Sequence, residues 1–284
     1  PEVREQVQSV GGKFVDTGVS AVGEGGYARE LTAEEQKQVN DVLTRHVQQA
    51  DAIITTASIP GKPSPKILTE EQIMIRDMAR NYAQEKLAPA AAQREKAREI
   101  EPQVIAELGE LGFLGMTIDP DWGGAGADYV SYALALIEIA AGDGSVSTMV
   151  SVHNAPVCAV LDRFATPEQK EKWLRPLAEG QHIGSFALTE PQAGSDASNL
   201  KTRAVKTNEG WRINGSKQFI SSARIGKTTV LFAVTDPDKG KRGISCFVTG
   251  NDRPGFSIVR VEEKLGQKAS DSCALAFEDM EVPF

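Results

Sequence analysis

The stretch from Phe186 to Arg203 gathers hydroxyl, amide, carboxylate and glycine residues after a short hydrophobic segment. Residues 183–188 are apolar, and Pro191 can neither donate to a strand ladder nor sit easily in a helix, so we predict a strand that ends in a polar loop. Gly194 would give this loop a backbone conformation that is closed to other residues. The groups left to face a ligand are Thr189, Gln192, Ser195 and the backbone amides around Gly194. These groups suit a cofactor that contains a diphosphate and a polar heterocycle.

Four segments share a pattern with one enzyme family. They are Leu188–Asp196 (LTEPQAGSD), Ile213–Ser221 (INGSKQFIS), Arg242–Val248 (RGISCFV) and Lys264–Asp271 (KLGQKASD). In order and spacing they resemble the middle domain of FAD-dependent acyl-CoA dehydrogenases. The resemblance covers about residues 67–284 and implies an N-terminal helical domain over 67–182 and a middle β domain over 183–284. We expect the C-terminal helical domain of that family to be absent.

The resemblance implies FAD as the cofactor and gives roles to single residues. Thr189 would bond the edge of the flavin ring, and Ser195 would lie near both the diphosphate and the acyl-CoA substrate. Residues 219–221 correspond to the family's Trp-Ile-Thr element, which stacks on the ring and places a hydroxyl near N5; Phe and Ser keep the aromatic face and the hydroxyl. The expected cofactor-binding residues are Phe186, Leu188, Thr189, Gly194, Ser195, Phe219, Ile220 and Ser221. Without the resemblance, Phe219 and Ile220 would be core residues and the hydroxyls would cap turns.

The family removes the α proton of an acyl-CoA thioester with a carboxylate and passes the β hydrogen as hydride to the flavin. The resemblance therefore implies dehydrogenation of acyl-CoA to trans-2-enoyl-CoA in fatty acid β-oxidation, an electron-transfer flavoprotein as acceptor, and a homo-oligomer. The family's carboxylate belongs to the C-terminal domain, so we assign no catalytic residue and expect this chain to be inactive alone. Glu190 and Asp196 are interpreted as structural. The alternatives are a flavin monooxygenase or nitroalkane oxidase of the same fold, and a non-catalytic nucleotide-binding fragment.

Helical spacing dominates the part of the chain that precedes this loop. Helices are predicted over 69–87, 102–112, 128–141 and 147–164, and Thr166-Pro-Glu-Gln169 should begin another. After Gly180 the pattern changes to short apolar runs separated by turn residues, at 183–188, 200–207, 210–213, 229–234, 244–248, 256–261 and 273–277. The predicted fold class is α+β, an all-helical domain followed by an antiparallel β-barrel domain. His153, Cys246 and Cys273 are interpreted as packing residues.

Residues 1–66 fall outside the acyl-CoA dehydrogenase resemblance. Segments Pro1–Ser9 and Ala52–Lys66 resemble the NAD-binding domain of the alpha subunit of proton-translocating nicotinamide nucleotide transhydrogenase. No Gly-x-Gly-x-x-Gly occurs in residues 1–66, so we expect a partial Rossmann-like α/β fragment that binds no NAD. Its predicted elements are helices over 1–10 and 31–49 and strands over 11–15 and 52–56. The start at Pro1 suggests a fragment or a chimera.

The composition is that of an ordinary globular protein, with 40% hydrophobic and 25% charged residues. A net charge of -8 argues against nucleic-acid and anionic-membrane partners, which require basic surfaces. The sequence has three cysteines and no Cys-x-x-Cys, so it predicts neither a disulfide framework nor a metal site. We expect a reducing compartment, the cytoplasm or the mitochondrial matrix of a eukaryote.

Overall fold

The computed structural model describes residues 2–9, 12–20, 29, 31–47 and 68–284. The chain divides into two compact units, residues 1–69 and 70–284. In the first unit α1 (Glu2–Ser9) and α2 (Ala33–Val47) are helical, as predicted. The strand predicted at 11–15 is wrong for its described residues, because 12–15 form no ladder and Phe14 instead packs under the Arg4 guanidinium. The strand predicted at 52–56 lies outside the described residues.

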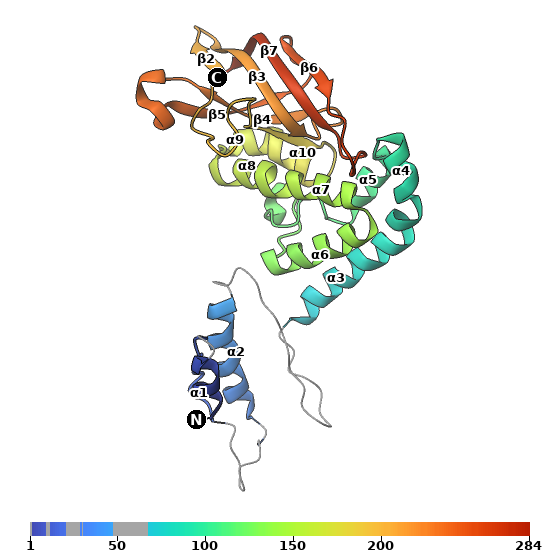
Figure 1. Ribbon diagram of the computed structural model, residues 1–284, viewed down its shortest axis with the longest axis vertical. Coiled ribbons are helices and arrows are strands. Elements are labelled where there is room, and N and C mark those ends of the chain that lie inside the picture. Colours follow the sequence, from blue (N-terminus) through green and yellow to red (C-terminus); the bar gives the residue numbers. More distant parts are fainter. Residues whose placement is uncertain (1, 10–11, 21–28, 30, 48–67) are drawn as a thin grey trace. The chain divides into compact units, whose positions relative to one another are not determined.

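All the regular elements between residues 70 and 178 are helices, which confirms the prediction (Figure 1). The helix predicted from residue 69 is α3 (Glu70–Tyr82), and it continues through a π-helical turn at Ala83–Leu87 and a 3-10 turn at Ala88–Ala90 that contains Pro89. The following helices are α4 (Ala91–Ala97), α5 (Pro102–Glu110), α6 (Tyr129–Gly142), α7 (Gly144–Val152), α8 (Ala159–Phe164), α9 (Pro167–Gln169) and α10 (Arg175–Ala178). Shorter turns complete this part, namely a 3-10 turn at Pro120–Trp122 and π-helical turns at His153–Cys158 and Lys170–Leu174.

Capping side chains fix the first residues of two helices. The Asp128 carboxylate accepts the Ser131 N–H at 2.7 Å and begins α6. At the helix start predicted from Thr166, Thr166 and Gln169 form a capping box, because each side chain bonds the other residue's backbone N–H, at 3.3 and 3.0 Å. Among the described residues no helix is long and apolar enough to cross a membrane.

The second part is a seven-stranded curled sheet, and every predicted strand is present in it. The strands are β1 (Gly184–Ala187), β2 (Arg203–Lys206), β3 (Gly210–Ser221), β4 (Thr228–Val234), β5 (Ile244–Gly250), β6 (Phe256–Val261) and β7 (Ser272–Pro283). Their order is β1-β4-β2-β3-β7-β6, with β5 paired to β4.

The prediction of an antiparallel barrel is wrong in strand direction, because the sheet, which curls into a half-barrel, is mixed. β1 pairs with β4 in parallel, from Gly184 opposite Thr228 to Ala187 opposite Leu231, and β2 touches β4 in parallel at Arg203 and Val234. The physical reason is that β1 makes no hairpin with the next strand. The loop after it crosses over, so β4 returns beside β1 in the same direction. Apolar alternation does not reveal strand direction.

Each face of the sheet packs on a separate core. One face, with Ile213, Leu231 and Phe277, buries its side chains inside the half-barrel. The opposite face packs against α8 and α10, where Val230 meets Leu161 and Leu177, and Figure 1 shows these helices beneath β4 and β5. The helices thereby fix the strand ends from which the candidate site extends.

The cysteine predictions are half right. Cys273 is buried in β7, as expected of a small core residue. Cys246 is exposed, because β5 pairs with β4 alone and lies at the margin of the sheet.

Candidate functional site

Two segments that are distant in sequence meet at the candidate site. The first is the chain that leaves β1 at residues 188–190, and the second is the bulge in β3 between Lys217 and Ile220. The Gln218 N–H donates to the Thr189 carbonyl at 2.9 Å, and the Lys217 ammonium donates to the Leu188 carbonyl at 2.9 Å. The structure thus brings Leu188 and Thr189 beside the segment of Phe219.

Glu190 is buried where these segments cross. One carboxylate oxygen accepts the Lys217 ammonium at 2.7 Å and the Thr202 N–H at 3.1 Å, and the other accepts the Lys201 N–H at 2.6 Å. Burial alone would raise the pKa of the Glu190 carboxyl, but Lys217, Thr202 and Lys201 outweigh it and hold the pKa at about 2. These bonds to a lysine and two backbone amides agree with the interpretation of Glu190 as a structural residue.

The loop after Glu190 departs from the prediction at two residues. Gly194 does not adopt a left-handed backbone, and a Cβ placed on it would meet no atom within 4 Å. Glycine therefore leaves open space on this loop rather than permitting an unusual conformation. Gln192 is exposed, but its amide nitrogen already bonds within the protein, because it donates to Glu190 at 2.7 Å and to the Asn199 carbonyl at 3.2 Å. Asp196 accepts the N–H and hydroxyl of Ser198, at 3.2 and 2.5 Å.

Phe219 occupies an unusual position in the β3 bulge. Its side chain is 60% exposed and its φ is 61°, in the left-handed region that is unfavourable for a bulky residue. Ile220, the next residue, is buried at 1% exposure in the half-barrel core. The core alternative therefore describes Ile220 and not Phe219. Backbone strain held in place at an exposed aromatic residue is typical of functional sites.

Besides Ile220, two further predicted residues contribute no exposed side chain to this region. The Phe186 ring packs against Phe232, with centroids 5.1 Å apart, on the face of the sheet that α8 and α10 cover. Leu188 is half-buried and packs with Leu200 and Val234.

The remaining predicted residues leave polar groups free. Among the described residues, the hydroxyls of Thr189, Ser195 and Ser221 bond no other protein group, and neither do the N–H groups of Gly194 and Ser195. These free groups are therefore available to a ligand.

A further unsatisfied hydroxyl lies next to this set. The Ser222 hydroxyl is buried and unpaired within the described part of the chain, and Ser222 also has a left-handed φ of 61°. Together with the free hydroxyls and the exposed aromatic ring, it fits a planar, acceptor-rich ligand such as the predicted flavin.

His153 is a packing residue, as predicted. Its Nδ1 accepts the Gly184 N–H at 3.1 Å, so the proton lies on Nε2, which donates to the Leu177 carbonyl at 3.0 Å. Burial lowers the pKa of His153 to about 4. The neutral imidazole joins the helical part to the start of β1.

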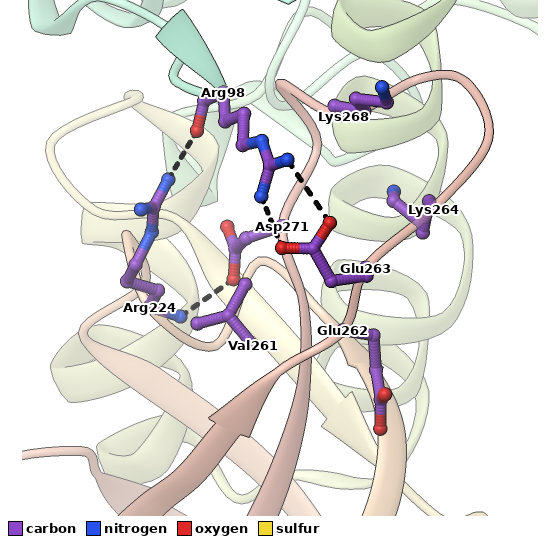
Figure 2. A pocket seen from close by; sticks show the side chains of 8 residues that line it. All are labelled: Arg98, Arg224, Val261, Glu262, Glu263, Lys264, Lys268 and Asp271. Atoms are coloured by element: carbon purple, nitrogen blue, oxygen red, sulfur yellow. Dashed lines mark hydrogen bonds and ion pairs between the residues drawn. The ribbon is translucent and has the colours of Figure 1, made fainter.

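A separate polar cavity of about 210 Å³ lies at the loop between β6 and β7 (Figure 2). The Arg98 guanidinium faces the Glu263 carboxylate at 2.6 Å, and the Arg224 N–H donates to Asp271 at 2.8 Å. None of the predicted site residues lines it. Across the described residues no cluster of three or more His, Cys, Asp or Glu side chains could hold a metal ion.

Lys217 is the residue of this region that sequence reasoning missed. A usable signal was present, because Lys217 continues the alternation of Ile213 and Gly215 and so occupies an inward position of β3. A lysine at an inward position needs a buried acceptor, and here that acceptor is the Glu190 carboxylate.

Three family models match the chain. Residues 69–181 match the acyl-CoA dehydrogenase N-terminal domain, and residues 185–280 match the acyl-CoA dehydrogenase middle domain. Residues 1–81 match the alanine dehydrogenase/PNT C-terminal domain. Two different families are therefore represented in one chain.

Individual relatives agree with these matches. The chain is 42% identical over 216 residues to an acyl-CoA dehydrogenase of Bacillus subtilis, covering 76% of this chain and 57% of that protein. It is similar to a solved structure described as the electron transferring flavoprotein of Acidaminococcus fermentans (42% identity, TM-score 0.74, 76% of this chain and 57% of that chain). It is also similar to a glutaryl-CoA dehydrogenase of Mycobacterium smegmatis in complex with FADH2 (32% identity, TM-score 0.71, 76% and 54%). The chain spans little more than half the length of these relatives.

Proposed function

Because residues 69–181 and 185–280 belong to the acyl-CoA dehydrogenase family, we propose that this chain acts in the FAD-dependent α,β-dehydrogenation of acyl-CoA thioesters to trans-2-enoyl-CoA. The observation that carries the proposal is the pairing of free hydroxyls with an exposed aromatic ring held at a left-handed φ. This set lies on the segments that the family resemblance assigns to the flavin. The middle-domain match and the relative bound to FADH2 support the choice of cofactor.

The residues that would hold FAD are those with unsatisfied groups. The Thr189 and Ser221 hydroxyls would bond the ring edge, Phe219 would offer its aromatic face, and Ser195 with the Gly194 N–H would meet the diphosphate. When bound, FAD supplies the hydride acceptor for the β hydrogen of the substrate. The open space at Gly194 would let a ligand approach the backbone closely.

The titratable groups near these segments would not take the α proton. Glu190 is committed to Lys217 and two backbone amides, and its low pKa disfavours proton uptake at neutral pH. His153 is buried and bonded on both nitrogens. We therefore assign the described residues to binding and orientation, and we propose that the carboxylate base belongs to a segment outside these domains.

The wider assignments rest on the same family membership. We propose an electron-transfer flavoprotein as the electron acceptor, a homo-oligomeric assembly, and a role in fatty acid β-oxidation. We propose domain limits of 67–182 and 183–284 for the helical and middle domains. Residues 1–66 would be a partial Rossmann-like fragment that adds no NAD site, because the Gly-x-Gly-x-x-Gly pattern is missing from them.

Titration of the purified chain with FAD tests the proposal. We expect uptake of the cofactor with quenching of flavin fluorescence, and we expect anaerobic addition of acyl-CoA to perturb the visible flavin band. NAD serves as the control nucleotide and should not compete. A chain that takes up no FAD, or that binds NAD and FAD alike, would contradict the proposal.

A further inference from the structure

Lys217 and Glu190 form the most deeply buried ion pair of the sheet domain. Their side chains are 0% and 2% exposed, and the ammonium lies 2.7 Å from the carboxylate. Transfer of two charges out of water is costly, and apolar residues of similar size often give equal or greater stability. Stability alone therefore does not account for a lysine at this inward position of β3.

The bonds of this pair converge on the two segments that carry the free groups. Lys217 donates to the carbonyl of Leu188 and to the carboxylate of Glu190, which are the two neighbours of Thr189. On the other strand Lys217 lies at the start of the bulge that turns Phe219 outward. One buried ammonium is thus bonded on both sides of Thr189 and is two residues from Phe219.

Glu190 extends the connection to the far end of the polar loop. Its carboxylate accepts the backbone N–H groups of Lys201 and Thr202, where the loop returns to the sheet just before β2. Gln192 also bonds this carboxylate from within the loop. The two ends of the loop that carries Gly194 and Ser195 are therefore fastened to the same anion.

We propose that Lys217 and Glu190 are positioning residues of the flavin site, an inference that rests on the function proposed above. They fix the separation and direction of the Thr189 hydroxyl and the Phe219 ring, so that both meet one planar ligand. Neither side chain touches the ligand, because both are enclosed by protein. Their contribution is the geometry of the two segments.

The test compares this pair with the other deeply buried ion pair of the described residues, Arg94 and Asp143, whose charged atoms are also 2.7 Å apart. The double variants are Lys217→Met with Glu190→Gln, and Arg94→Met with Asp143→Asn. Each removes both charges. Asn at position 143 keeps the one oxygen that accepts the Ser145 and Val146 N–H groups, whereas Gln at position 190 keeps one of the two oxygens that accept the Lys201 and Thr202 N–H groups. The FAD dissociation constant, the flavin absorbance spectrum, the flavin midpoint potential and the thermal midpoint of the FAD-free chain are measured for both variants and the wild type.

We expect the Lys217 and Glu190 double variant to raise the FAD dissociation constant by about 10-fold or more, the scale of one lost positioning bond, and to shift the flavin spectrum and potential. The Arg94 and Asp143 double variant should have a thermal midpoint comparable to that of the Lys217 and Glu190 double variant, but should retain the wild-type flavin properties. If flavin binding and spectrum follow the thermal midpoint equally in both variants, the pair is merely structural and the inference is wrong. If the wild-type chain itself takes up no FAD, the proposed function fails and the inference fails with it.

Discussion

The two buried ion pairs of residues 70–284 have the same length and different surroundings. Arg94 and Asp143 join the helices of the first part, where Arg94 also donates to the Leu87 carbonyl at the end of the π-helical turn. The other oxygen of Asp143 accepts the Ser145 N–H at 2.8 Å and caps α7. This pair satisfies backbone groups that irregular helix ends leave free.

Lys217 and Glu190 also satisfy backbone groups, but strained and unsatisfied groups remain beside them. Phe219 and Ser222 have left-handed φ values, and the Thr189 hydroxyl is free within the described part of the chain. Proteins leave such groups unpaired at few places, and chiefly where a ligand completes them. The comparison teaches that burial of an ion pair does not by itself indicate a functional site. The indication comes from strained residues and unsatisfied hydrogen-bonding groups beside the pair.

The largest expected effect comes from removing one cation of either pair. Arg94→Met and Lys217→Met should each lower the free energy of unfolding by about 3–5 kcal/mol, because a buried carboxylate loses its partner. Urea denaturation measures the change. Adding Asp143→Asn or Glu190→Gln should restore much of the stability in both cases. If Lys217→Met lowered the free energy of unfolding by less than about 1 kcal/mol, water would have to reach Glu190. The two pairs would then not be equally buried.

A pH titration of stability extends the comparison to His153. Its pKa is about 4 in the folded chain and near 6.5 when unfolded, so between these values the unfolded state binds more protons. The free energy of unfolding should therefore fall as pH is lowered from about 6.5 to 4, by a total of about 3 kcal/mol from this group. His153→Gln should flatten this slope, whereas His182→Gln should change it less, because His182 is only partly buried. An unchanged slope in the first variant would contradict the neutral, doubly bonded imidazole.

The variant Phe219→Gly separates the effect of backbone strain on stability from the effect of the aromatic ring on FAD binding. Glycine relieves a left-handed φ that costs a bulky residue about 1–2 kcal/mol, and it adds an entropy cost of about 0.5–1 kcal/mol. Because the ring is 60% exposed, we expect the free energy of unfolding to be unchanged or to rise by up to about 1 kcal/mol, while FAD binding weakens. The control is Ile220→Ala, which should cost about 2–5 kcal/mol because Ile220 is buried in the core. A destabilised Phe219→Gly variant would place Phe219 in the core after all.

The sequence was sufficient for the helices and strands of residues 70–284, and insufficient for the internal bonding of the candidate site. Strand and helix positions follow from periodicity and capping, which are local signals, and Thr166 with Gln169 shows how well these work. The parallel pairing of β1 with β4 depends on a crossover that no local pattern encodes. The role of Lys217 depends on a contact with Glu190 across 27 positions, which spacing alone does not predict. The free hydroxyls could be proposed from the family resemblance, but only the structure shows that no described protein group uses them.

The smallest expected effect concerns the free hydroxyls of Thr189 and Ser221. It decides whether these unsatisfied groups bind the flavin. Thr189→Ala and Ser221→Ala should each weaken FAD binding by about 1 kcal/mol, or about 5-fold in the dissociation constant, because each would remove one of the proposed hydrogen bonds to the ring. Ser198→Ala is the matched control, since its hydroxyl already bonds Asp196 at 2.5 Å within the same loop. Fluorescence titration of the flavin measures all three variants, and thermal denaturation without FAD shows whether each chain is intact. Neither Thr189 nor Ser221 bonds a protein group through its hydroxyl in the described residues, so their substitution should leave stability nearly unchanged. Equal FAD affinity across the three variants would mean that the free hydroxyls face water. The difference between the surroundings of the two ion pairs would then result from packing and not from a ligand-binding site.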